Sequence, residues 1–368
     1  MSQPAVPKLF QPVKVGQHWL GHRVVMAPLT RYRANKAHVH GDLAVTYYSQ
    51  RAIMPGTLLI SEAAFISPKA GGFDNVPGIW NDEQVAGWKP ITDVVHEKGS
   101  RIFCQLWALG RGAIPEVLDR EGLPYVSSGD KRLMREPRTP RPLTIPEIKE
   151  YIDMYRDAAR CAVRAGFDGV EVHGANGYLV DQFTQDVSNN RTDEYGGSIE
   201  NRCRFALEVV DAIASAIGAD KTAIRFSPWG QFGDMLMDDP KPTFGYLVSE
   251  LAKRHPDLAY IHVVEPRAHG DLDRDVQPGE SNVFLRDIWK PRPYIAAGNY
   301  TRETAFEDAD KYGDLIAFGR LFIPNPDLPL RLAKDLPIAK GSRDLYYVPE
   351  EPHGYIDYPF SDDPNARL

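Results

Sequence analysis

The stretch EVHGANGYLVDQFTQDVSNNRTDEYGGSIENRCRF, residues 171–205, joins the end of a predicted strand, a polar loop and the start of a predicted helix. The run GFDGVEV that leads into it is short, apolar and β-branched, which is typical of a buried strand. His173, Asn176 and Tyr178 follow the end of this strand. The first two side chains can donate hydrogen bonds to one oxygen, and Tyr178 carries a phenol. Two donors and an acid suit a reaction in which negative charge develops on an oxygen while a nearby carbon takes a proton.

Each of these three residues also has a structural explanation. His173 can be a buried core histidine, Asn176 a turn residue that tolerates left-handed geometry, and Tyr178 a packing residue of a helix. The polar run at residues 188–197, SNNRTDEYGG, is however richer in hydrogen-bonding groups than a simple linker needs. Because all of these features follow one strand, they favour a functional site.

The pattern of a short apolar run, a polar or glycine-bearing loop and a helical segment occurs eight times in the sequence. Eight strands with intervening helices predict a (β/α)₈ TIM barrel of the α/β class. The predicted strands are Val24–Ala27, Leu58–Ser61, Arg101–Gln105, Gly169–His173, Thr222–Phe226, Tyr260–Val264, Tyr294–Ala297 and Leu315–Gly319.

Residues outside these repeats complete the expected architecture. Residues 8–23 predict a short hairpin that closes the bottom of the barrel. Thr144 and Glu147 predict a capping box at the start of one helix, and Gly218 is expected to end another. The long loop 107–143 after the third strand is expected to lack secondary structure and to act as a functional lid, so we expect a single domain over residues 1–368.

Composition narrows the class of protein and of partner. The formal net charge of -7 argues against a surface that binds nucleic acid or an anionic membrane, and no apolar run approaches the ~20 residues of a membrane span. Cys104, Cys161 and Cys203 lack the spacing of a zinc or iron–sulfur site. We therefore expect a cytoplasmic, metal-free protein, a monomer or homodimer, that acts on a small molecule.

The carboxyl ends of the predicted strands carry groups suited to a flavin, and in this fold the active site collects there. A buried Arg225 needs an anion, which the pyrimidine end of a reduced flavin supplies, although a salt bridge to an inward carboxylate is the alternative. Glycine N–H groups at the ends of the last two strands can hold a phosphate. No GxGxxG follows the first strand, so a Rossmann dinucleotide site is not expected. The cofactor candidates are Pro28, Leu29, Thr30, Ala63, Gln105, Arg225, Gly298, Asn299, Gly319 and Arg320.

Four motifs, MAPLTR (26–31), HGANGY (173–178), GRLFIPNPDL (319–328) and GYIDYP (354–359), resemble the old yellow enzyme family of FMN-dependent ene-reductases. The resemblance implies noncovalent FMN, its reduction by NADPH, and hydride delivery to the β-carbon of an α,β-unsaturated aldehyde or ketone. It further implies that His173 and Asn176 bind the substrate oxygen and that Tyr178 is the proton donor. Trp107 and Tyr347 match family residues near the substrate, and the candidates from Thr30 to Arg320 match FMN contacts. At a finer level the chain is similar to the fungal ergot-alkaloid members that act on chanoclavine-I aldehyde.

Three functions other than that of an ene-reductase are alternatives. A metal-dependent hydrolase on the same barrel can draw ligands from His38, His40 and His262, although the HxH pair is expected in a solvated loop and a buried Arg225 repels a metal. A non-catalytic flavin-binding protein does not require the His173, Asn176 and Tyr178 trio. An alkene isomerase uses reduced FMN without net consumption of NADPH.

Overall fold

Eight parallel strands close into a barrel in the computed structural model, which describes residues 6–270 and 272–362. Neighbours in the barrel follow chain order, and β15 pairs with β3 to close the ring. The barrel strands are β3 (Val24–Met26), β4 (Leu58–Ile60), β6 (Arg101–Trp107), β9 (Gly169–Gly174), β10 (Thr222–Phe226), β11 (Tyr260–Val264), β14 (Tyr294–Ala297) and β15 (Leu315–Phe318). The predicted TIM barrel is therefore confirmed. Of the single domain expected over residues 1–368, residues 1–5, 271 and 363–368 lie outside the described part of the chain.

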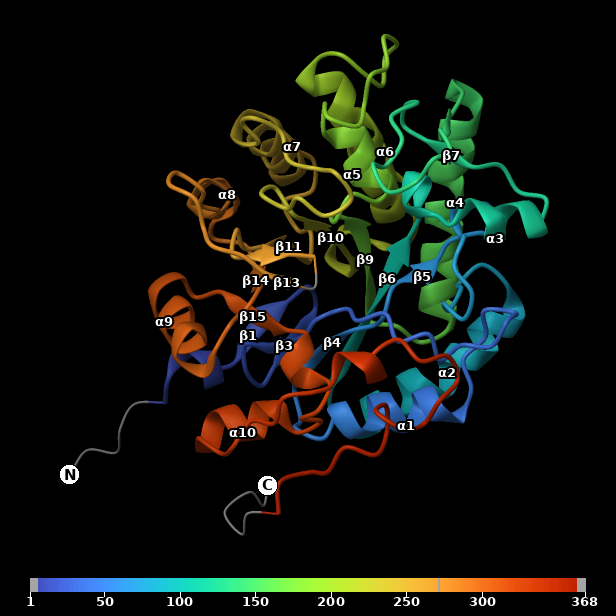
Figure 1. Cartoon of the computed structure of the whole chain (residues 1–368). Helices are drawn as coiled ribbons and strands as arrows, with labels where there is room; N and C mark the ends of the chain where they lie inside the picture. Colours follow the sequence, from blue (N-terminus) through green and yellow to red (C-terminus); the bar gives the residue numbers. More distant parts are fainter. Residues whose placement is uncertain (1–5, 271, 363–368) are drawn as a thin grey trace.

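A helix follows each barrel strand and covers the outside of the barrel, as Figure 1 shows. These helices are α1 (Asp42–Arg51), α2 (Asp82–Glu97), α4 (Ile145–Arg164), α6 (Ile199–Ile217), α7 (Lys241–Arg254), α8 (Val283–Trp289), α9 (Arg302–Tyr312) and α10 (Leu328–Lys334). The capping box is present at the start of α4, where the Thr144 side chain accepts from the Glu147 N–H and the Glu147 carboxylate accepts from the Thr144 N–H. Gly218 ends α6, as predicted.

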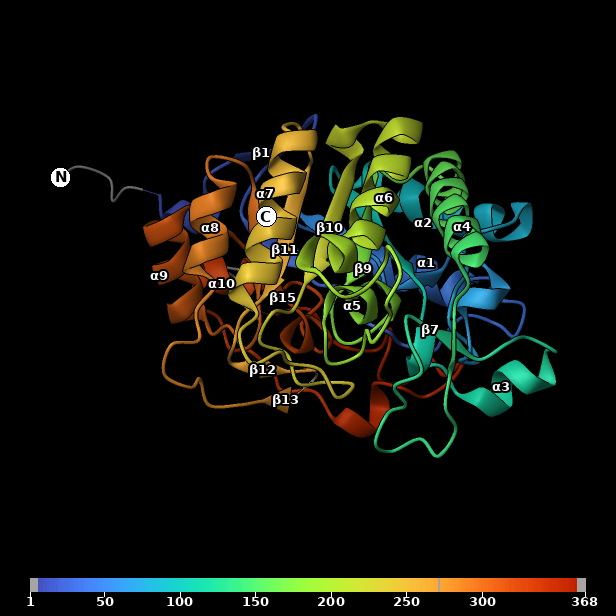
Figure 2. The same cartoon turned by 90° about the horizontal axis from the view of Figure 1, so that it is seen from above.

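The N-terminal hairpin lies at the end of the barrel opposite the long loops (Figure 2). Its strands β1 (Val13–Val15) and β2 (His18–Leu20) pair in antiparallel fashion. Val15 and Leu20 are buried in the apolar cluster that fills the barrel interior, together with Phe103 and Tyr260. The hairpin therefore closes the bottom of the barrel, as expected.

Above this apolar layer the barrel interior becomes polar. Val170 and Val172 of β9 pack in the cluster between the barrel and its helices. Because successive side chains of a strand point to opposite faces, Glu171 and His173 point into the barrel. Gln105 is the register partner of Glu171, and Arg225 is the register partner of His173. The sheet register thus gathers polar side chains at the carboxyl end of the barrel.

The loop 107–143 is not structureless, which corrects the prediction. It contains η3 (Gly110–Gly112), α3 (Pro115–Arg120) and a parallel pair of β7 (Val126–Ser127) with β8 (Arg141–Pro142). These elements are too short for sequence periodicity to reveal. The remaining short elements are η1 (Lys8–Phe10), β5 (Ala64–Phe65), η2 (Pro68–Ala70), α5 (Leu179–Thr184), η4 (Ala219–Lys221), β12 (Ala268–His269), β13 (Leu272–Asp273), η5 (Arg320–Phe322) and η6 (Arg343–Leu345). Among the described helices, none combines the length and apolar character needed to cross a membrane.

Candidate active site

A cavity of about 1220 Å³ lies at the carboxyl ends of the barrel strands. Every residue predicted to bind cofactor or substrate, or to act in catalysis, lines it, although these residues come from all parts of the chain. They are Pro28, Leu29, Thr30, Ala63, Gln105, Trp107, His173, Asn176, Tyr178, Arg225, Gly298, Asn299, Gly319, Arg320 and Tyr347. The structure therefore brings the candidates together, while their individual roles stay predictions.

His173 is placed to donate a hydrogen bond from its Nε2 atom. Its Nδ1 atom accepts from the Ala175 N–H at 3.4 Å, which assigns the single proton of a neutral imidazole to Nε2. Burial, together with the positive charge of Arg225, holds the His173 pKa well below its ordinary value. The ring stacks on Trp107 with centroids 6.0 Å apart. His173 is thus a fixed neutral donor in the cavity wall.

The turn Asn176-Gly177-Tyr178 is fixed from several sides. Asn176 has a left-handed φ of 57° and donates its N–H to Ser227 Oγ at 2.8 Å. The Gly177 N–H donates to Asp181 Oδ2 at 2.9 Å, and a Cβ at Gly177 would lie 2.9 Å from the Phe232 carbonyl oxygen. This turn therefore requires the glycine that follows Asn176.

Tyr178 directly precedes α5, and its ring packs against two aromatic residues of the cavity wall. Its centroid lies 4.8 Å from that of Trp107 and 4.9 Å from that of His173, both in edge-on contact. The Tyr178 phenol and the His173 imidazole therefore lie next to each other in the cavity wall. This is the arrangement that a substrate oxygen and its neighbouring carbon require.

Arg225 presents a half-buried cation to the same cavity. Its Nε atom has no hydrogen-bond partner within the described residues. Burial lowers the Arg225 pKa, and the nearby Glu171 carboxylate opposes that shift. The sequence left open a salt bridge between Arg225 and an inward carboxylate. Glu171 does supply a nearby carboxylate charge, but its oxygens accept hydrogen bonds from Gln105 and His262.

The ends of β14 and β15 form the other side of the cavity. Gly298 has a φ of 117°, and a Cβ there would lie 3.1 Å from the Ala268 Cβ. Arg267 Nε donates to the Gly298 carbonyl at 2.6 Å, which holds this turn against the loop after β11. Arg320, predicted as the counter-charge of a phosphate, pairs with Asp273, and both side chains are partly exposed. Since exposed ion pairs are weak, a doubly charged phosphate can compete for Arg320.

Several cavity residues escaped the sequence analysis. Tyr32, Phe73, Phe232 and Leu272 also line the cavity, and the Tyr32 ring centroid lies 5.8 Å from that of Tyr347. Tyr32 follows the MAPLTR motif directly, so its position was a usable signal. Phe73 and Phe232 lie in loops and Leu272 lies in the two-residue strand β13, where a repeating strand pattern gives no information.

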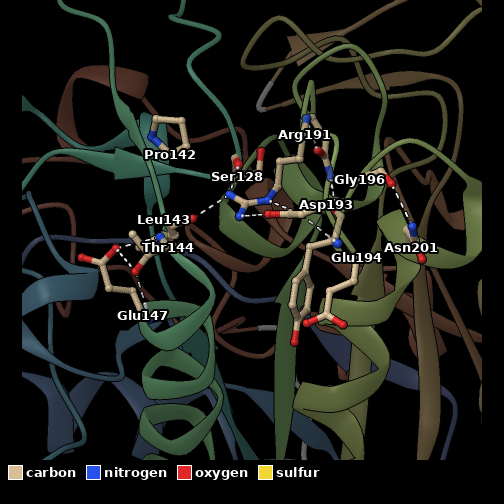
Figure 3. A network of polar contacts seen from close by, with 12 residues as sticks. Ser128, Pro142, Leu143, Thr144, Glu147, Arg191, Asp193, Glu194, Gly196 and Asn201 are labelled. Atoms are coloured by element: carbon tan, nitrogen blue, oxygen red, sulfur yellow. Dashed lines mark hydrogen bonds and ion pairs between the residues drawn. The ribbon is translucent and has the colours of Figure 1, made fainter.

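The polar run after α5 is a structural network (Figure 3), and none of its residues is among those that line the cavity. Arg191 donates to the Ser128 and Leu143 carbonyls at 2.8 and 2.7 Å and forms an ion pair with Asp193. These contacts tie the loop after α5 to the residues that directly follow β7 and β8. The hydrogen-bonding groups of this run therefore support the site from outside.

The metal-dependent alternative is not favoured. His38 bonds the Val76 carbonyl through Nδ1 at 2.6 Å, and His262 bonds Glu171 inside the barrel. His40 lies 3.4 Å from Glu62 with both side chains buried, so the expectation of a solvated loop was wrong for this residue. In the described ranges, no three His, Cys, Asp or Glu side chains come together as metal ligands.

The fold and the site define a class: a (β/α)₈ barrel whose cavity offers a half-buried cation, a glycine turn and aromatic walls to a flat, phosphate-bearing cofactor. Residues 8–339 match the NADH:flavin oxidoreductase / NADH oxidase family. The chain belongs to this family and, within it, to the old yellow enzymes.

Two curated relatives and one solved structure illustrate the relationship. The chanoclavine-I aldehyde reductase of Penicillium roqueforti is 51% identical over 359 residues, which cover 96% of each chain. An NADP-dependent oxidoreductase of Aspergillus flavus is 49% identical over 96% of this chain and 97% of its own. An old yellow enzyme from Pichia sp. AKU4542 has a TM-score of 0.90 and 38% identity, covering 98% of this chain and 96% of that one. The resemblance to the old yellow enzymes, including their fungal branch, is confirmed.

The cofactor of this enzyme is FMN, and the residues present fit it. The unpartnered Arg225 Nε suits the pyrimidine end of the ring system, and the Gly298 turn, which lines the cavity with no side chain, suits the phosphate. When bound, FMN supplies the hydride chemistry of the family. The chain is therefore an oxidoreductase of the old yellow enzyme type.

Proposed function

We propose that this enzyme uses NADPH to reduce the C=C bond of an α,β-unsaturated aldehyde or ketone. His173 and Asn176 hold the carbonyl oxygen, and Tyr178 gives its phenolic proton to the α-carbon while the β-carbon receives the hydride. The chanoclavine-I aldehyde reductase supports an enal of that kind as the substrate, and the NADP-dependent relative supports NADPH as the reductant. The monomeric or homodimeric state and the cytoplasmic location also stay predictions.

The observation that carries this proposal is the contact of Tyr178 with both Trp107 and His173 in one cavity wall. A neutral His173 donates to a developing oxyanion without itself losing a proton, so the acid role falls to the adjacent phenol. The aromatic wall around this pair excludes water from the reacting carbon. A flavin carrier without catalysis would need none of these groups.

Tyr178→Phe tests the proposal because it keeps the ring and removes only the proton. Reduction of the flavin by NADPH should be unchanged, while reoxidation by an enal falls about 10²–10⁴-fold, or roughly 3–5 kcal/mol of barrier. Stopped-flow absorbance follows the two half-reactions separately. Tyr32→Phe is the matched control, since it removes another phenol from the same cavity wall.

Equal slowing of both half-reactions in Tyr178→Phe, or of neither, would remove Tyr178 from the mechanism. Stoichiometry separates reductase from isomerase: a reductase consumes one NADPH for each alkene, whereas an isomerase releases a rearranged alkene with no net consumption.

A further inference from the structure

Glu171 is a fully buried carboxylate that no step of the proposed reaction uses. It points into the barrel beneath the cavity, two residues before His173 on β9. Its Oε1 atom accepts from Gln105 Nε2 at 2.7 Å, and its Oε2 atom accepts from His262 Nδ1 at 2.9 Å. Burying a carboxylate is costly unless hydrogen bonds or a nearby cation stabilise its charge.

The charge state of this cluster follows from its contacts. Burial alone would raise the Glu171 pKa, but His262, Arg225 and Gln105 together hold it below its ordinary value. Burial lowers the His262 pKa, and its Nε2 atom has no hydrogen-bond partner among the residues described. The cluster therefore contains an ionised Glu171, a neutral His262 and the cation of Arg225.

An ionised carboxylate can only accept hydrogen bonds, so it decides which end of the Gln105 amide faces it. The Gln105 Nε2 group is held toward Glu171, which leaves the Gln105 oxygen as the acceptor for the cavity. The same carboxylate also offsets part of the Arg225 charge. Gln105 and Arg225 are both proposed to contact the flavin ring system.

We propose that Glu171 is a positioning residue that orients the Gln105 amide and offsets part of the positive charge of Arg225, and that it thereby sets the reduction potential of bound FMN. This inference rests on the proposed flavin contacts of Gln105 and Arg225. Reduction adds negative charge at the pyrimidine end of the ring system, which a nearby carboxylate opposes and a nearby cation favours. Glu171 therefore keeps the potential lower than Arg225 alone would.

The test uses the FMN-loaded enzyme and its Glu171→Gln variant, which keeps the side-chain shape and removes the charge. Anaerobic dye-equilibrium titration should show a potential that is raised by about 30 mV, equal to a tenfold shift toward reduced FMN for a two-electron couple. The FMN dissociation constant should rise several-fold, because Gln105 is no longer held in one orientation. Glu171→Asp retains the charge and should keep the potential near that of the wild type.

Asp168→Asn is the matched control. Asp168 precedes β9 at its other end, is buried, and bonds His96 Nε2 at 2.8 Å and the Ile102 N–H at 2.8 Å. Its loss should lower stability without moving the potential. An equal upward shift in Asp168→Asn would trace the effect to general loosening of the barrel and overturn the inference.

An unchanged or lowered potential in Glu171→Gln with FMN in place would also overturn it. If that variant cannot be purified folded, His262→Leu tests the same carboxylate. Loss of the hydrogen bond from His262 favours protonation of Glu171, so a smaller rise of the reduction potential is expected. An unchanged potential in His262→Leu would refute the inference. Failure of the wild-type protein to bind FMN would instead remove the proposed function itself.

Discussion

Asp181→Asn should change how the stability of this enzyme depends on pH. Asp181 is fully buried next to the turn Asn176-Gly177-Tyr178, where its oxygens accept from the Gly177 N–H and from Gln185 Nε2, each at 2.9 Å. Burial raises its pKa from 3.8 to about 7, against the opposing hydrogen bonds and the more distant Arg111 cation. The folded protein therefore keeps a proton on Asp181 that the unfolded chain has released.

Between pH 3.8 and about 7 the folded state binds more protons at this site than the unfolded state. Raising the pH through this window consequently lowers the free energy of unfolding of the wild type. The shift corresponds to about 3 kcal/mol between about pH 5 and about pH 8. An asparagine does not titrate, so the variant should gain stability relative to the wild type by that amount as the pH rises.

Urea unfolding of both FMN-saturated proteins at several pH values measures this difference. Asp314, whose pKa burial raises to about 6, titrates in both proteins and so cancels. Parallel stability curves for the two proteins across this range would refute the assignment of a protonated Asp181. A variant that loses stability relative to the wild type as the pH rises would show the opposite sign and refute it equally.

Three further predictions follow from individual contacts. His173→Ala with Asn176→Ala should abolish the charge-transfer absorption of a bound phenol while FMN stays bound, and a persisting band would contradict their donor role. Arg111→Ala removes hydrogen bonds to the Lys131 and Gly233 carbonyls at 3.0 and 2.8 Å, so limited proteolysis within residues 107–143 should become several-fold faster, at a cost of about 2 kcal/mol; unchanged cleavage would show that these bonds do not hold the loop. Glu147→Gln should lower the free energy of unfolding by about 1 kcal/mol above pH 4.5, because hydrogen bonding with Arg141 lowers the Glu147 pKa to about 2. The difference between variant and wild type should vanish as the pH falls through that value. Thermal unfolding that shows a pH-independent difference would contradict this.

The barrel could be predicted from the sequence because its signals are local. Each strand is a short apolar run that ends in a polar or glycine-bearing loop, and the observed strands Thr222–Phe226, Tyr260–Val264 and Tyr294–Ala297 match the predicted bounds. The capping box of α4 likewise involves only the four residues 144–147. In this fold, knowing where a strand ends also locates the cavity, which explains why the predicted residues line one cavity.

The sequence did not reveal contacts that depend on how distant segments meet. Glu171 lies 66 residues from Gln105 and 91 residues from His262, and only the parallel strand order β6–β9–β10–β11 brings the three side chains together inside the barrel. The β7–β8 pair escaped prediction because two-residue strands leave no periodic pattern. The sequence by itself determined the barrel and the residues at its rim, whereas tertiary structure alone decided which of them share hydrogen bonds and charge, because those interactions act through space between elements far apart in the chain.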